Sequence, residues 1–223
     1  MKSSRLVFVE SDGSPYEHDD FDRNFVTVVV AGDSSCGKTS LLERIARNTF
    51  STSTLSTVCI DIIMKRVRLA DGRRAKIKFL DLVGQDITRA YQPAPFHKGA
   101  DVVLAVFDCK RPETFESLYR WKQRLNMDLP IGYHFVVVCN KIDLLANEDE
   151  FRRVYDSYSS EASNNLNSDA FIMVSAKSGF NCDLLISDFI REMLDKKAAT
   201  DDRASLVRVD ARNKIKTAAC PDC

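Results

Sequence analysis

The chain has 223 residues, 44% of them hydrophobic, and its 32 basic and 32 acidic residues give a formal net charge of +0. This size and apolar content suit one well-buried domain with polar tails, and the lack of excess basic charge argues against a nucleic-acid partner. The seven cysteines form no C-x-x-C pair inside the predicted domain, which indicates free thiols in a reducing cytosol, and no apolar run is long enough to span a bilayer.

The first long apolar segment leads into the most specific motif of the chain. Residues 25–31 are β-branched and nearly all apolar, as expected of a strand buried on both faces. Residues 32–39 match the phosphate-binding loop G-x-x-x-x-G-K-S/T, and a helix-forming segment follows. In such a loop, backbone N–H groups point at a polyphosphate, Lys38 reaches the terminal phosphates and the Thr39 hydroxyl ligates Mg²⁺. The alternative is a glycine turn that precedes a lysine by chance. The predicted phosphate-binding residues are Gly32, Asp33, Ser34, Ser35, Cys36, Gly37, Lys38, Thr39 and Ser40.

Two later strand-like runs end in polar loops of the kind that recognise a base. The run 133–139 precedes Asn-Lys-Ile-Asp, and the run 170–174 precedes Ser-Ala-Lys. The carboxylate of Asp143 can accept hydrogen bonds from the ring N–H and the exocyclic amine of guanine, whereas adenine offers no such pair. Asn140 would tie the loops together, the Lys141 stem would lie along the base, and the Ala176 N–H would bind the guanine carbonyl. The alternative is an ATP-using enzyme in which these loops are coincidental. The predicted base-binding residues are Asn140, Lys141, Asp143, Ser175, Ala176 and Lys177.

With these three elements in this order, the sequence from about 24 to 196 resembles the small GTPases of the Ras superfamily, most closely the Rab branch. The resemblance implies a switch that binds GTP and GDP with Mg²⁺ and hydrolyses GTP slowly. Residues 81–85 are similar to the D-x-x-G-Q of the second switch. Asp81 would hold Mg²⁺ through water, the Gly84 N–H would sense the γ-phosphate, and Gln85 would be the catalytic residue that orients the attacking water.

The same resemblance assigns the first switch and one helix. Thr57 would close on Mg²⁺ and the γ-phosphate, although its Ser/Thr-rich surroundings at 51–57 also read as a solvated loop. Phe50 would pack against the guanine. Residues 111–121 are similar to the Rab helix S/T-F-x-x-L-x-x-W, whose apolar residues, Trp121 included, also pack a helix on a sheet.

The second switch departs from the Rab pattern. Val83 is a stiff, β-branched residue where the family has a small one, and the following residues read Asp86-Ile87-Thr88 instead of Glu-Arg-Phe. These departures favour an alternative function, a GTP-binding scaffold that hydrolyses little and acts as a static interaction module.

The order of elements predicts a doubly wound α/β fold, a mostly parallel six-stranded sheet with helices on both faces, as in P-loop GTPase domains. We expect a flexible arm at 1–23, whose apolar run 6–9 is able to pair with a sheet edge, the GTPase domain at 24–196 and a flexible tail at 197–223. A hairpin turn at 71–72 and a closing helix over 183–195 complete the domain.

The tail ends in two cysteines, Cys220 and Cys223, after several basic residues. Two terminal thiols resemble the prenylated ends of Rabs, although their spacing is unusual and the alternative is a pair of unmodified cysteines. The resemblance also implies an exchange factor, a GTPase-activating protein and effector proteins as partners. It implies a cytoplasmic protein that is peripheral on the cytosolic face of endomembranes and regulates vesicle traffic.

Overall fold

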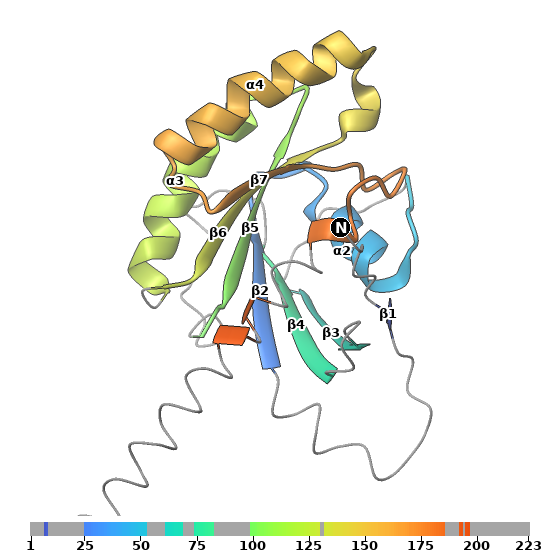
Figure 1. Cartoon of the computed structure of the whole chain (residues 1–223), viewed down its shortest axis with the longest axis vertical. Helices are drawn as coiled ribbons and strands as arrows, with labels where there is room; N and C mark the ends of the chain where they lie inside the picture. The colour runs from blue at the N-terminus through green and yellow to red at the C-terminus, as the bar shows by residue number, and fades with distance from the viewer. Residues whose placement is uncertain are drawn as a thin grey trace, which may run out of the picture.

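The computed structural model describes residues 7–8, 25–52, 61–68, 74–82, 99–129, 132–185, 192–193 and 195–196. Over these residues the chain forms a twisted sheet with helices on both faces (Figure 1). The strands are β1 (Val7–Phe8), β2 (Phe25–Ala31), β3 (Asp61–Arg68), β4 (Arg74–Asp81), β5 (Val102–Asp108), β6 (His134–Asn140) and β7 (Ala170–Met173). The helices are α2 (Lys38–Arg47), α3 (Pro112–Asp128), α4 (Glu148–Asn164) and the 3-10 helix η2 (Ile142–Leu144).

The strand order across the sheet is β1-β3-β4-β2-β5-β6-β7. The neighbours from β4 to β7 are all parallel. β3 is antiparallel to β4, with Asp61 opposite Asp81 and Arg68 opposite Arg74, as the hairpin signal predicts, and the turn at 71–72 lies outside the described residues. The predicted six-stranded, mostly parallel sheet is therefore confirmed. The short β1 adds a seventh strand, antiparallel to β3 at the edge.

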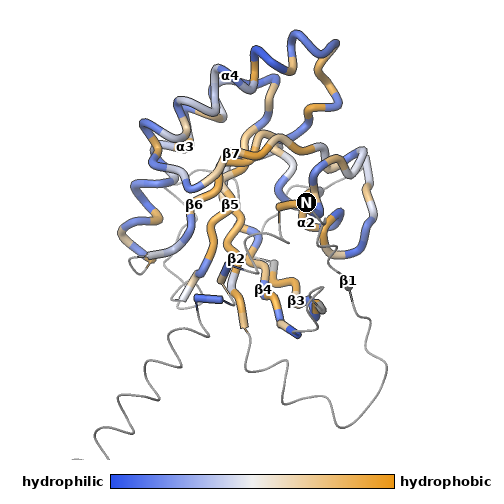
Figure 2. The backbone as a smooth tube through the Cα atoms, in the orientation of Figure 1, coloured by the Kyte–Doolittle hydropathy of each residue, from blue (hydrophilic) through white to orange (hydrophobic). Residues whose placement is uncertain are grey.

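Each face of the sheet carries its own apolar core. On one face, Leu41 and Ile45 of α2 pack with Phe79 of β4. On the other face, α3 and α4 cover the sheet, and the rings of Phe107 and Phe115 meet edge to face with centroids 5.1 Å apart. The central strand β5 is buried along its whole length because helices cover both of its faces. Figure 2 shows hydrophobic residues concentrated in the strands in the middle and many hydrophilic residues along α3 and α4.

Local signals in the sequence set the helix boundaries. Pro112 occupies the start of α3, where its missing N–H costs no hydrogen bond. The side chain of Asn147 caps α4 by accepting a hydrogen bond from the Glu150 N–H at 2.9 Å. Of the predicted closing helix, residues 184–185, 192–193 and 195–196 are helical, and the rest lies outside the described residues. Among the helices described, none combines the length and apolar character needed to cross a membrane.

The cysteines of the described domain are free thiols, as predicted, and all four of them are buried. They are Cys36, Cys109, Cys139 and Cys182. Cys59 lies outside the described residues. Burial raises the pKa of the Cys36 thiol, so this side chain fills the loop interior as a small neutral group.

Parallel pairing places three loops at one edge of the sheet. β2, β6 and β7 all run in the same direction, so the segments that follow them emerge at the same edge. These segments are the phosphate-loop sequence at 32–39, the loop at 140–144 and the loop at 174–179. The topology therefore brings together three motifs, the first and last of which lie more than 130 residues apart in the chain.

Candidate nucleotide-binding site

The phosphate loop contains two glycines that no other residue could replace without strain. Gly32 has φ +138°, and a Cβ there would stand 2.1 Å from the Val106 carbonyl oxygen. Gly37 begins α2 with φ +86°, and a Cβ there would lie 2.5 Å from Nδ2 of Asn140. Ser35 also has a left-handed backbone, with φ +62°, although it carries a side chain. The left-handed backbone at Ser35 is unusual for a residue with a side chain, so contacts with other parts of the protein must hold the loop in this conformation.

Side chains from α3 and its N-terminal turn hold the first part of the loop. The indole Nε1–H of the buried Trp121 donates to Oδ1 of Asp33 at 3.0 Å. Nη2 of Arg111 donates to the Ser34 carbonyl at 2.9 Å, while its Nε donates to Oδ2 of Asp108 at 3.3 Å. These two anchors of the loop were missed in the sequence, where Trp121 reads as a packing residue. The available signal was that a buried indole N–H requires an acceptor.

The loop after β6 holds the second part of the phosphate loop. Nδ2 of Asn140 donates to the Cys36 carbonyl at 2.9 Å. Nζ of Lys141 donates to the Ser35 carbonyl at 2.7 Å and pairs with Asp108 at 2.7 Å. Asn140 therefore ties the loops together in the way that the sequence predicts, and Lys141 has an additional contact with the phosphate loop.

Lys38 points into the loop, where it is 6% exposed and donates to the Asp33 carbonyl at 2.8 Å. Burial lowers the pKa of Lys38, and the nearby Asp81 carboxylate opposes that effect. A buried ammonium group at a helix N-terminus is a suitable partner for an anion, because both the charge and the exposed N–H groups favour it. The arrangement fits a polyphosphate.

Thr39 and Asp81 form the predicted metal pair. The Thr39 hydroxyl donates to Oδ2 of Asp81 at 2.6 Å, and Asp81 is only 1% exposed. Hydroxyl and carboxylate oxygens are the ligand type that Mg²⁺ prefers, so the donor set fits that ion. In the described part of the chain no cluster of three or more His, Cys, Asp or Glu side chains is placed to hold a metal. An ion beside this pair would take its other ligands from water, from phosphate oxygens and, as the sequence predicts, from Thr57, which lies outside the described residues.

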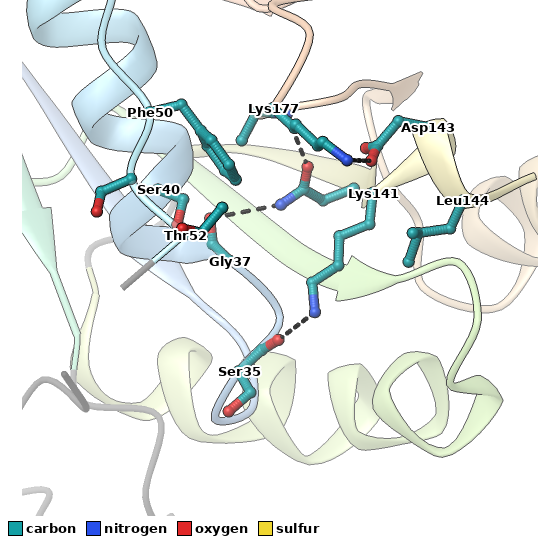
Figure 3. A pocket seen from close by; sticks show the side chains of 12 residues that line it. Ser35, Gly37, Ser40, Phe50, Thr52, Lys141, Asp143, Leu144 and Lys177 are labelled. Atoms are coloured by element: carbon teal, nitrogen blue, oxygen red, sulfur yellow. Dashed lines mark hydrogen bonds and ion pairs between the residues drawn. The ribbon is translucent and has the colours of Figure 1, made fainter. Parts of the chain in front are cut away.

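A cavity of about 390 Å³ lies between the phosphate loop and the two base loops. Figure 3 shows its side chains, with Phe50 on one side, Asp143 and Leu144 on the other, and Lys141 reaching Ser35. The volume is that of a small-molecule site. The lining residues are Ser35, Gly37, Ser40, Phe50, Ser51, Thr52, Asn140, Lys141, Asp143, Leu144, Ala176 and Lys177.

The base loops orient the carboxylate of Asp143. The hydroxyl of the fully buried Ser175 donates to its Oδ1 at 2.6 Å, and Nζ of Lys177 lies 3.8 Å from its Oδ2. The Ala176 N–H donates to Oδ1 of Asn140 at 3.2 Å, so a guanine carbonyl at this point would share or replace that bond. Ser175 thus orients the Asp143 carboxylate, which is the group predicted to contact the base.

The structure brings together the predicted phosphate-binding and base-binding residues, with Phe50 at the cavity and the Thr39–Asp81 pair beside it. Several predicted residues lie outside the described residues, namely Thr57, Val83, Gly84, Gln85, Cys220 and Cys223. Leu144, Ser51 and Thr52 line the cavity without having been predicted, since an apolar residue and hydroxyls in loops give no specific signal.

Comparison with known proteins matches residues 27–195 to the Ras family. The Ypt/Rab-type GTPase YPT7 of Saccharomyces cerevisiae is 28% identical over 202 residues, which cover 86% of this chain and 95% of YPT7. Ras-related protein RABE1d of Arabidopsis thaliana is 28% identical over a matched region that covers 80% of this chain and 80% of RABE1d. Ras-related protein Rab-13 of Mesocricetus auratus is 27% identical over 76% of this chain and 80% of its own length. With the family match spanning most of the domain, the chain belongs to the Ras family as a Rab-like small GTPase, and hydrolysis of GTP is the reaction of that family.

Proposed function

We propose that this chain is a guanine-nucleotide-dependent switch that regulates vesicle traffic through effectors bound in its GTP form. The observation that carries the proposal is the single cavity lined both by the phosphate loop and by the loops after β6 and β7. A site for one nucleotide needs a phosphate-binding part and a base-binding part in the same cavity. Membership in the Rab-like group supports the role in traffic.

Each part of the site has a role in this proposal. Lys38 and the N–H groups of the loop neutralise and position the phosphates, and Asp143 selects guanine. Thr39 and Asp81 would hold Mg²⁺, which supplies charge neutralisation at the β- and γ-phosphates. Gln85 orients the attacking water. Such sites hydrolyse GTP at about 10⁻⁴ s⁻¹ alone and depend on an activating protein for speed.

Single-turnover hydrolysis of GTP, with and without cell extract as a source of activator, tests the enzymatic half of the proposal. We expect a slow intrinsic rate that the extract accelerates and that Gln85→Leu lowers. Val83→Ala is the informative second variant, because relief of the bulky side chain next to Gly84 should raise the rate. Tight GTP binding with no hydrolysis under any of these conditions would favour the static scaffold instead.

The membrane half of the proposal depends on Cys220 and Cys223. Two lipid chains, or one chain with the neighbouring basic residues, would suffice for stable attachment to endomembranes. We expect Cys220→Ser with Cys223→Ser to release the protein into the cytosol with nucleotide binding unchanged. Intact-mass measurement of the protein from its native cells is the direct check. An unmodified C-terminus would remove the membrane role and leave the GTPase.

A further inference from the structure

Arg44, near the end of α2, holds two backbone carbonyls in the wall of the cavity at its base end. Its Nε donates to the Ala176 carbonyl at 2.8 Å, and its Nη2 donates to the Lys177 carbonyl at 2.8 Å. Its Nη1 donates to both the backbone carbonyl and Oδ1 of Asn48, each at 3.0 Å. One planar guanidinium thus serves four acceptors in two different segments.

One segment lines the cavity, and the other lies two residues before a residue that does. Ala176 and Lys177 form the wall after β7. Asn48, the C-cap of α2, has a left-handed backbone with φ +53°, and Phe50, two residues later, forms another part of the wall. The Asn48 N–H also donates to the Arg44 backbone carbonyl at 2.9 Å, so Asn48 is held through both its backbone and its side chain.

In both segments Arg44 donates to backbone carbonyl oxygens. A charged, forked donor fixes a carbonyl more firmly than a neutral one, and the fork also fixes direction. The bonds to the Ala176 and Lys177 carbonyls restrict the movement of this backbone, in which the Ala176 N–H donates to Oδ1 of Asn140. A base that leaves by displacing the wall at 176–177 must break the bonds of that wall to Arg44.

We infer that Arg44 is a positioning residue that braces the base pocket closed and thereby slows nucleotide release. The inference rests on the proposed function, because it assumes that a guanine nucleotide fills the cavity. Arg44 is not one of the residues that line the cavity. It acts through the backbone of Ala176, Lys177 and Asn48.

The release rate of a fluorescent GDP analogue from the full chain tests this inference. We expect Arg44→Ala to release the nucleotide at least tenfold faster, which corresponds to about 1.4 kcal/mol. Arg44→Lys keeps the charge and the aliphatic stem but not the fork, so its rate should lie between the two. If Arg44→Ala does not fold, the lysine variant alone carries the test, because a rate equal to that of the parent overturns the inference.

Arg47→Ala is the matched control. Arg47 lies three residues further along the same helix, and its guanidinium pairs with Glu43 at 2.7 Å instead of with the pocket walls. Its loss should change the release rate by less than twofold. An equal acceleration in Arg47→Ala would mean that any weakening of α2 has this effect, and it would overturn the specific role of Arg44.

Two further measurements distinguish bracing from a merely structural role. Inosine diphosphate lacks the exocyclic amine, so the ratio of GDP to inosine diphosphate affinity reports on the Asp143 contact. Arg44→Ala should weaken both nucleotides equally and keep this ratio, whereas Asp143→Asn should reduce it. Millimolar guanidinium, compared with equal sodium chloride, should slow release again in Arg44→Ala. A changed ratio, or no rescue, would contradict bracing through the walls.

The outcomes separate this inference from the proposed function. If the parent protein retains GDP but Arg44→Ala releases it at the same rate, the inference fails and the nucleotide switch stands. If the parent protein binds no guanine nucleotide, the proposed function fails first, and the brace fails with it.

Discussion

The two ends of the nucleotide cavity are built differently. At the phosphate end, two of the side chains that hold the loop are almost fully buried, with Trp121 and Asn140 each 1% exposed. The side chains of Arg111 and Lys141, which also hold it, are 38% and 32% exposed. At the base end, the side chain of Lys177 is 61% exposed and Leu144 is 49% exposed. The phosphate loop is therefore fixed by the core of the domain, whereas the base pocket is closed by surface loops and a half-buried arginine.

This difference indicates which part of the site supplies affinity and which part supplies selectivity. A loop fixed before binding loses little freedom when it receives a ligand, so the phosphate end should supply affinity that is common to all nucleotides. The base end should decide which base is accepted and how fast the nucleotide leaves. Substitutions at the phosphate end should accordingly change stability, and those at the base end should change selectivity.

The largest effect should come from Gly32→Ala at the phosphate end. The new Cβ would stand 2.1 Å from a backbone oxygen of the central strand β5, which cannot move aside. We expect the free energy of unfolding to fall by about 3 kcal/mol or more, as measured by urea denaturation. Gly179→Ala at the base end is the control. It has φ +84° but no atom closer than 3.7 Å, so it should lose only about 1–2 kcal/mol. An equal loss of the free energy of unfolding in Gly32→Ala and Gly179→Ala would show that the two ends of the cavity are equally rigid.

The next largest effect should come from Asp143→Asn at the base end. The asparagine keeps an oxygen that can accept the Ser175 hydrogen bond, but it can no longer accept from both guanine donors. Each charge-assisted hydrogen bond is worth about 1.5–3 kcal/mol, so preference should shift from guanosine to xanthosine nucleotides by about tenfold or more. Competition binding measures the shift. Equal binding of ATP and GTP by the parent protein would remove the basis for guanine selection.

The sequence was sufficient for the fold and for most of the residues that line the cavity. Long β-branched runs defined the central strands, and the phosphate-loop motif occurs in the strand–loop–helix context that it requires. Each of these signals lies within one short stretch of sequence, so it can be recognised without knowledge of distant residues. The arm that contributes β1 was predicted only as a run able to pair, since pairing depends on which edge is open.

The supporting residues could not be read from the sequence because their partners are distant. Arg44 lies 132 residues before Ala176, and Trp121 lies 88 residues after Asp33. On a helix, a charged residue such as Arg44 is typical of the solvent-facing side, and a tryptophan is typical of the buried side. Only the three-dimensional arrangement shows that the charged group meets loop carbonyls and that the indole N–H meets a carboxylate.

A smaller effect should come from Trp121→Phe. This change keeps an aromatic ring in the core but removes the hydrogen bond to Asp33. We expect the free energy of unfolding to fall by about 2 kcal/mol, and GDP release to accelerate severalfold because the phosphate loop loses one anchor. Tyr119→Phe is the control on the same helix, since its hydroxyl donates to Glu161, away from the loop. If both variants released GDP equally fast, the anchor would be irrelevant to binding.

The smallest effect concerns the pH dependence of the Asp108 contacts. Burial alone would raise the pKa of Asp108, but hydrogen bonds from Lys141 and the Lys110 N–H, together with the charges of Lys141 and Arg111, outweigh burial and hold this pKa below its ordinary value. A carboxyl whose pKa is lower in the folded state stabilises the fold above its unfolded pKa of about 3.9, and that stabilisation is lost as the pH falls through the folded value.

Asp108→Asn should therefore be less stable than the parent by about 1 kcal/mol at pH 7, and the difference should hold down to about pH 5. Below about pH 4 the difference should shrink, because the parent carboxylate becomes protonated and loses its ion pairs as well. Urea denaturation of both proteins across this range measures it. Glu148→Gln is the control, since Glu148 and its partner Arg152 are 79% and 70% exposed and their pair should contribute little at any pH. A difference between Asp108→Asn and the parent that persisted unchanged to pH 3 would mean that the Asp108 carboxylate supports the phosphate loop without depending on its charge.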